Sequence, residues 1–265
     1  MKVIAKVFLL LLVTLLLTPP IFAGWVGEQV TTDSEGKETT EINYMQQNKV
    51  KTVGAEEIII IDLEKNLFYM ISPEHKVYWS GIPEQMRKEM EETQKKMEEA
   101  YLQKLTPEQQ EQYKKYKEST EKETKEAAKE KKIKLEVKKT SETTTIAGYP
   151  TRKYQVWVNG ELKEEKWIST KIKIIDEIDL EKLEKFQKAM SGLEAEESYG
   201  SSPDYMHLME IGAEMKTIVY YEGGSTITET KKIEKKQIPD SEFKVPKGYR
   251  KLSLFELQKL EEGMH

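Results

Sequence analysis

The chain has 265 residues, of which 37% are hydrophobic, 34% charged and 9% aromatic, a composition that excludes a disordered polyampholyte and a helical membrane bundle. The formal net charge of -5 provides no basic surface of the kind that phosphate backbones require, so nucleic acid is not expected as a partner. The absence of cysteine removes disulfides, thiol nucleophiles, thiolate metal sites and the acylated cysteine of a lipoprotein.

The charged residues are strongly skewed in type. Glutamate occurs 41 times against 6 aspartates, and lysine 39 times against 3 arginines. Enrichment in lysine and glutamate is reported for heat-adapted proteomes, although AT-rich coding gives the same bias. The skew favours a thermophilic source.

Residues 1–23 have the parts of a secretory signal peptide. Lys2 and Lys6 form the positive start, residues 7–17 are apolar, and Ala23 offers a cleavage position. The alternative is an uncleaved anchor, but this apolar run is short of the ~20 residues that span a bilayer as a helix. The sequence therefore predicts export and a mature domain of residues 24–265, soluble in the periplasm.

An N-terminal group of strands is predicted next. Polar and apolar residues alternate through residues 25–30 and 40–45, as in strands covered on one face. The run of four isoleucines at residues 58–61 has no alternation, so we expect this strand to be buried on both faces. Further strands are predicted at residues 67–71 and 76–80. The regular turn spacing favours one curved antiparallel sheet over βαβ units.

Residues 82–131 are predicted to be a helical insertion, because they contain no glycine and consist mainly of good helix formers. The first helix carries a narrow apolar stripe of Met86, Met90, Met97 and Tyr101. A second helix begins at Thr106 with a hydroxyl cap, a proline in the first turn and Gln109 three residues after the cap. It has almost no apolar face, so we expect it to protrude or to pack by one edge.

Strands resume at Lys132, and Asn159-Gly160 predicts a tight hairpin between residues 154–158 and 162–168. Counting from a two-residue turn places Trp157, Leu162 and Ile168 on one face. The same count places a second set on the other face: Tyr154, Val156, Val158 and Trp167. Large residues on both faces suggest a curved sheet whose concave face packs against helices or a ligand.

The C-terminal part alternates helices and strands. A short helix is predicted from Asp179 to Met190, followed by a turn capped by Ser202 or Asp204. The last hairpin turns at Gly223-Gly224, and a terminal helix is expected from Ser253.

The sequence holds little catalytic machinery. His75, His207 and His265 have no serine or aspartate at a motif spacing, and phosphate loops, nucleophile elbows and metalloprotease helices are absent from the sequence. An enzyme would have to use glutamates alone, and glutamates in charge runs are usually exposed surface. We therefore expect a non-enzymatic protein without a cofactor.

A copper site is one alternative. Met206-His207-Leu208-Met209, together with other thioether and imidazole groups, could ligate copper in an oxidising compartment: Met190, Met215, Met264 and His265. Methionines also fill irregular cores, and selective copper sites have denser Met/His spacing than this. No metal is expected.

An ordered set of motifs covers residues 25–250. It comprises strands ending in Asp62, the Tyr78-Trp79 pair, the helical insert, the segments around residues 146–157 and 167–169, and Phe243-x-Val245-Pro246-x-Gly248-Tyr249. Through these motifs the chain resembles exported bacterial domains of unknown function that share the half-barrel of the lipoprotein carriers LolA and LolB. The resemblance implies an α+β fold, an open antiparallel half-barrel with helices on its concave face, and carriage of acylated cargo.

Two functions follow from these observations. The first is to hold a lipid or a lipoprotein acyl chain in the half-barrel. The candidate lining residues are Phe68, Tyr78, Trp79, Tyr154, Trp157 and Trp167, with Met86 and Met90 on the lid. The same aromatics could simply form the core, and only one face of each strand can point inward.

The second function is that of an envelope scaffold or adaptor that docks a partner through the charged helical hairpin. The insertion at residues 82–131 is longer than a lid requires. A solvated protrusion without a partner is the remaining alternative, because charge-laced helices are often merely exposed.

Overall fold

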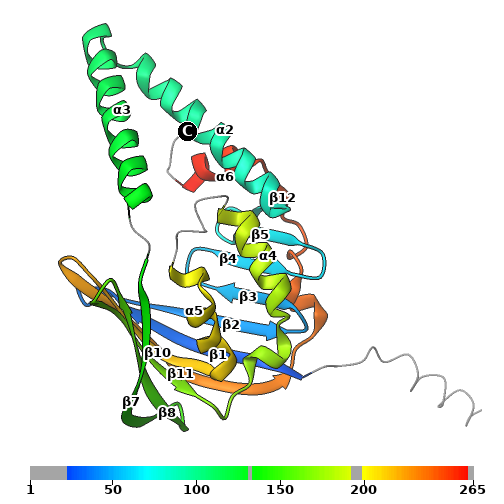
Figure 1. Cartoon of the computed structure of the whole chain (residues 1–265). Helices are drawn as coiled ribbons and strands as arrows, with labels where there is room; N and C mark the ends of the chain where they lie inside the picture. Colours follow the sequence, from blue (N-terminus) through cyan, green and yellow to red (C-terminus); the bar gives the residue numbers. More distant parts are fainter. Residues whose placement is uncertain (1–22, 131–132, 192–198, 262–265) are drawn as a thin grey trace, which may run out of the picture.

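In the computed structural model, which describes residues 23–130, 133–191 and 199–261, twelve strands form one sheet (Figure 1). The predicted signal peptide, apart from Ala23, lies outside these residues. The first six strands are β1 (Ala23–Thr32), β2 (Glu38–Gln46), β3 (Lys49–Val53), β4 (Ile58–Asp62), β5 (Leu67–Ser72) and β6 (Val77–Gly81). The others are β7 (Leu135–Ile146), β8 (Tyr149–Val158), β9 (Glu161–Ser169), β10 (Ala213–Tyr221), β11 (Gly224–Gln237) and β12 (Arg250–Lys251).

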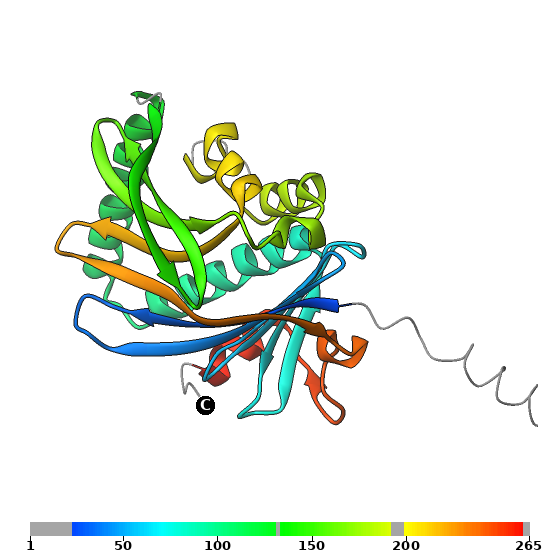
Figure 2. The same cartoon turned by 90° about the horizontal axis from the view of Figure 1, so that it is seen from below.

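The strand order is β12-β6-β5-β4-β3-β2-β1-β11-β10-β9-β8-β7. The pairs are antiparallel except for β12 with β6, which is parallel. The sheet is strongly curved and does not close (Figure 2). The predicted curved antiparallel sheet is therefore confirmed.

Within the described ranges, five α-helices accompany the sheet: α2 (Pro83–Gln103), α3 (Pro107–Glu130), α4 (Leu180–Ser191), α5 (Pro203–Ile211) and α6 (Leu254–Glu261). Short 3-10 turns are η1 (Ile174–Glu177), η3 (Tyr199–Ser201) and η4 (Asp240–Phe243). The start of α2, together with α4, α5 and α6, lies on the concave side of the sheet, and α2 and α3 form a hairpin that rises away from it (Figure 1). The predicted helical insertion is confirmed.

Local capping explains where these helices begin. Thr106 and Gln109 form the predicted reciprocal cap, because the Gln109 amide donates to Thr106 Oγ1 at 3.4 Å and the Thr106 amide donates to Gln109 Oε1 at 3.0 Å. The Glu256 and Ser253 amides make the same exchange at the start of α6. Ser202, not Asp204, caps α5 by accepting from the Tyr205 amide.

Strand β4 is covered on both faces, as its four isoleucines predicted. Ile59 and Ile61 pack against a cluster that includes side chains of α2, α4 and α6. Ile58 and Ile60 belong to a second cluster with Phe243 of η4. Successive residues of a strand point to opposite faces, so an uninterrupted apolar run requires cover on both.

The hairpin of β8 and β9 corrects one prediction. Asn159 and Gly160 have φ of 52° and 86°, as a type I′ turn requires. A register shift follows at Val156 and Trp157, so Ile168 pairs with Arg152 and packs with Tyr154 in one cluster. The assignment of Ile168 to the face of Trp157, and of Trp167 to the face of Tyr154, was wrong because the bulge adds one residue and reverses the faces beyond it.

Candidate functional site

Three predicted lining residues lie together on the concave face. Phe68, Trp79 and Met86 are 7%, 1% and 8% exposed, and they share a cluster with Phe186 of α4 and Leu257 of α6. We call this the closed cluster; its buried members are Leu63, Phe68, Val77, Trp79, Met86, Ile178, Phe186, Leu252, Leu254 and Leu257. The protein's own side chains fill the concave face at this point.

Polar and aromatic contacts fix the closed cluster. The Trp79 indole N–H donates to Glu89 Oε2 of α2 at 2.8 Å, and the same oxygen accepts from the Leu254 amide at the start of α6. The Phe68 ring centre lies 6.4 Å from that of Trp79 and 6.3 Å from that of Phe186. One carboxylate thus ties the sheet, α2 and α6 together.

The other predicted lining residues are dispersed. Tyr154 is 6% exposed and packs with Leu208 of α5 in a separate cluster. Tyr78 points to the opposite face from Trp79 and joins the cluster of Phe243. The two remaining tryptophans, Trp157 and Trp167, point away from Tyr154 and are stacked by lysines 4.5 Å and 5.1 Å away. Their role as ligand contacts stays a prediction.

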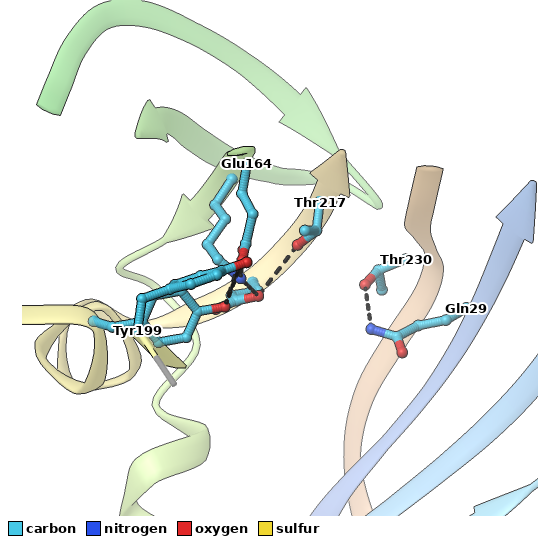
Figure 3. A network of polar contacts seen from close by, with 8 residues as sticks. Gln29, Glu164, Tyr199, Thr217 and Thr230 are labelled. Carbon is cyan, nitrogen blue, oxygen red and sulfur yellow. Dashed lines mark hydrogen bonds and ion pairs between the residues drawn. The ribbon is translucent and has the colours of Figure 1, made fainter. Parts of the chain in front are cut away.

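Between the apolar clusters, the concave face is polar. Thr52 Oγ1 donates to Asn43 Oδ1 at 2.7 Å, and Asn43 Nδ2 donates to Gln29 Oε1 at 3.0 Å. Gln29 Nε2 donates to Thr230 Oγ1 at 3.4 Å, and Figure 3 shows this last contact. Side chains of a strand point alternately to the two faces of the sheet. The register places these side chains on the same face as Met45, which packs against the closed cluster. The ladder crosses four neighbouring strands, from β3 to β11.

A buried ionic network lies beside this ladder (Figure 3). Lys166 Nζ is 3.0 Å from Glu164 Oε2 and 2.8 Å from Glu214 Oε2, and the Lys166 and Glu164 side chains are 4% and 6% exposed. Two phenols complete it, because Tyr199 and Tyr205 donate to Glu164 at 2.7 Å and 2.9 Å. The network therefore fastens η3 and α5 to β9.

Burial and charge set the protonation of the network. Burial alone would lower the pKa of Lys166, but the Glu214 and Glu164 carboxylates outweigh it and raise the pKa overall. Burial raises the pKa of Tyr205 to about 12, and burial together with the Glu164 hydrogen bond raises that of Tyr199. At neutral pH the ammonium is charged and both phenols are neutral.

This network is a correction to the expectation that charge runs are exposed. Residues 163–166 form a Lys-Glu-Glu-Lys run inside the predicted strand 162–168, and Glu164, Glu165 and Lys166 are buried. Their position inside a predicted strand was the available signal, because a strand that is covered on both faces buries every side chain. Glu164 accepts from Tyr199 and Tyr205, and Glu165 accepts from Lys153.

An open groove lies between α2 and α3. It has a volume of about 920 Å³. Its lining residues are Met90, Gln94, Met97, Glu98, Tyr101, Tyr113, Tyr116, Lys117, Thr120 and Gln258. Met90, Tyr101 and Tyr116 are 47%, 51% and 68% exposed. Of the predicted lining residues, Met90 is the one that reaches this groove.

Two contacts hold the groove's walls together. Lys117 Nζ of α3 is 2.7 Å and 2.6 Å from the two carboxylate oxygens of Glu98 on α2. The rings of Tyr101 and Tyr113 lie 5.6 Å apart. The methionine stripe predicted on α2 therefore begins in the closed cluster at Met86 and continues into an open, aromatic-lined groove.

The thioether and imidazole groups considered for copper are not gathered. Met190 packs against the closed cluster, whereas Met215 belongs to a different cluster. His207 is exposed on α5 and its Nδ1 lies 2.7 Å from Glu210 Oε2. Met264 and His265 lie outside the described residues, and within those residues no group of three or more His, Asp or Glu is arranged for a metal.

Sheet, helices and groove together define an open antiparallel half-barrel with helices on its concave face, the architecture that the resemblance implied. The chain belongs to the family described as Domain of unknown function (DUF4412), whose profile matches residues 73–249. None of the helices in the described ranges combines the length and the apolar character needed to cross a membrane. No curated protein matches the sequence significantly.

Several solved structures are distantly similar. PNGF-II gives a TM-score of 0.39 at 16% identity over 90% of this chain and 32% of its own, so the chain spans about a third of PNGF-II. An uncharacterized conserved protein from Thermus thermophilus gives 0.42 at 5% identity over 86% and 89%. MucB, in its complex with MucA from Pseudomonas aeruginosa, gives 0.37 at 7% identity over 84% and 56%. These likenesses are too distant to carry a functional argument.

Proposed function

We propose that this protein is a non-enzymatic binding protein of the cell envelope, exported to the periplasm and freed of its signal peptide. It holds an apolar ligand, a lipid or a lipoprotein acyl chain, in the groove between α2 and α3. The proposal keeps the predicted ligand class and moves the site from the floor of the half-barrel to its helical hairpin.

The observation that carries the proposal is the contrast in exposure along α2. Met86 is 8% exposed in the closed cluster, whereas Met90, one turn further on, is 47% exposed in the groove. A volume of about 920 Å³ lies within the roughly 300–1,000 Å³ of ligand sites. Methionine adapts to irregular apolar surfaces, and tyrosines add large apolar contact areas.

The floor of the half-barrel is a poorer place for an acyl chain. The side chains of Thr52, Asn43 and Gln29 bond to one another, but each amide nitrogen has a second N–H that the ladder does not use. A hydrocarbon lying on the ladder would remove these N–H groups from water without offering them partners, at a cost of about 1–3 kcal/mol for each unpaired group. The aromatic part of the floor is already occupied by Phe186 and Leu257. The groove combines apolar walls with access from solvent.

The test compares two charge insertions on one helix. Met90→Glu places a carboxylate inside the groove, and Ile82→Glu places one at the N-cap of α2, where Ile82 is 41% exposed and does not line the groove. Protein purified without detergent is titrated with a dansyl-labelled fatty acid and weighed by native mass spectrometry. We expect Met90→Glu to weaken binding about ten-fold or more, a change of about 1.4 kcal/mol, and Ile82→Glu to bind like the unmodified protein.

Two outcomes would reject this function. The unmodified protein could fail to bind the labelled fatty acid up to its solubility limit and arrive without lipid in native mass spectrometry. Alternatively, Met90→Glu could bind as tightly as Ile82→Glu while both variants melt like the unmodified protein. Either result would remove the groove as an acyl-chain site.

A second candidate is docking of an envelope protein through the same hairpin. The favouring observation is Tyr116 of α3, a large aromatic side chain that is 68% exposed. Replacing residues 107–131 with a short Gly/Ser linker removes the α3 wall of the groove, so we expect fatty-acid binding to weaken in the trimmed protein as well. Docking is therefore judged from a defined envelope partner alone. Loss of that partner by the trimmed protein, together with its retention by Met90→Glu, supports docking; retention of the partner by the trimmed protein rules it out.

A further inference from the structure

The two edges of the sheet are built differently. One edge is β12, which has two residues and is followed directly by α6. The other is β7, twelve residues long, which pairs with β8 alone in the described chain. Figure 2 shows β7 and β8 at one end of the curved sheet. A long edge strand presents unpaired backbone N–H and C=O groups to any chain that can pair with it.

The sequence of β7 limits which chain that can be. The regular part runs from Leu135 to Lys139, because the register against β8 shifts between Lys139 and Thr143. Leu135 and Val137 pack on the concave side with Tyr154 and α5. Glu136 and Lys138 alternate with them on the outer face, and both are exposed. Charges and bulges normally protect an edge, but opposite charges two residues apart can also select a complement.

We propose that β7 pairs antiparallel with β7 of a second copy of this chain, with Val137 opposite Val137 across the twofold axis. In this register Glu136 of each copy lies opposite Lys138 of the other, so two cross-strand ion pairs form on the outer face. The concave faces stay aligned because paired residues share a face. An interface made of the same strand twice is self-complementary, as twofold symmetry requires.

Neighbouring registers are excluded by charge. Alignment of the faces allows shifts of two residues at a time. A shift in one direction opposes Glu136 with Glu136, and a shift in the other opposes Lys138 with Lys138. Like charges directly opposite each other are destabilising. The register centred on Val137 also uses the whole regular run of the strand. The order of charges therefore specifies both the partner and the alignment.

The test uses charge reversal and mixing. Glu136→Lys gives an all-lysine outer face and Lys138→Glu an all-glutamate face, so each variant opposes like charges in its own dimer. Sedimentation velocity over a concentration series should show a reversible dimer for the unmodified protein and an association constant at least about ten-fold weaker for each variant, because two attractive pairs become repulsive. An equimolar mixture of the variants should dimerise, and the double variant should dimerise like the unmodified protein.

Two controls keep the test specific. Lys138 also pairs with Glu136 of its own strand and stacks on Trp157, so the melting temperature of every variant is measured. Lys232→Glu reverses an exposed charge on β11, a strand with a neighbour on each side. This variant should leave association unchanged. A protein that sediments as a monomer throughout the series overturns the proposal. So does a mixture that stays monomeric while the unmodified protein dimerises, since that dimer would not use this register.

Discussion

Two apolar regions of this protein share one helix, α2, and differ in what faces them. In the closed cluster, Met86 of α2 meets side chains from the sheet, α4 and α6. In the groove, Met90 and Met97 face α3 across open space, with Gln258 of α6 at one side. The residue types on α2 are the same. A methionine stripe alone therefore does not distinguish a core from a binding surface. The distinction depends on how many other helices and strands cover the stripe.

The largest effect is expected from Trp79→Ala. Trp79 is 1% exposed, touches Phe68 and donates to Glu89. Its removal should cost about 3–5 kcal/mol of unfolding free energy, from lost burial, the cavity and the lost hydrogen bond to Glu89. Urea unfolding measures the change. Trp157→Ala, at a partly exposed site on the other face, should cost less, and equal costs would contradict the assignment of Trp79 to a closed core.

A similar test applies to the buried network under α5. Lys166→Ala leaves Glu164 without its ammonium, which should cost about 3 kcal/mol, the lower end of the range for breaking a buried pair because Glu214 is 31% exposed. The double change Glu164→Gln with Lys166→Met should recover part of that loss, because it removes the uncompensated charge and keeps side-chain volume. A single variant as stable as the unmodified protein would show that the network does not hold α5.

The closed cluster should also depend on pH. Burial alone would raise the pKa of Glu89, but hydrogen bonds from Gln85, the Leu254 amide and Trp79 lower it overall. A depressed pKa gives stability that is present above the unfolded pKa of glutamate and is lost as pH falls through the lower folded pKa. Unfolding followed from neutral to acidic pH should show a smaller decline for Glu89→Gln than for the unmodified protein. Parallel declines would contradict the role of this carboxylate.

Much of the fold could be predicted from local sequence. Asn159-Gly160 specified its hairpin, Thr106 with Gln109 specified the start of α3, and the isoleucines of β4 specified cover on both faces, because each signal acts within a few residues. Strand β3 went unpredicted; it follows directly on a turn in which Gln47 and Asn48 have positive φ. The faces of β9 were wrong because a bulge is not visible in an alternation pattern.

The site was harder to predict than the fold. Phe68, Trp79 and Met86 were predicted as part of one set, and in the structure they lie in one buried cluster. Aromatics and methionines of strands and of a neighbouring helix commonly converge on one core. The burial of Lys166 depends on α5, which approaches from 37 residues or more along the chain, and no local pattern encodes that contact. Similarly, α2 shows a stripe, but only the placement of α4, α6 and α3 determines which part of the stripe stays open.

The smallest effect on stability is expected from Tyr116→Ser, on the wall of the groove. Tyr116 is 68% exposed, and serine and tyrosine have similar helix propensities, so unfolding free energy should change by less than about 0.5 kcal/mol. Binding of the labelled fatty acid should nevertheless weaken, because the groove loses an aromatic wall. The two measurements on one variant separate the regions: a loss of stability above about 1 kcal/mol would place Tyr116 in a core and remove the distinction between closed cluster and groove. Unchanged stability with weakened binding is the result that a ligand surface, and not a core, produces.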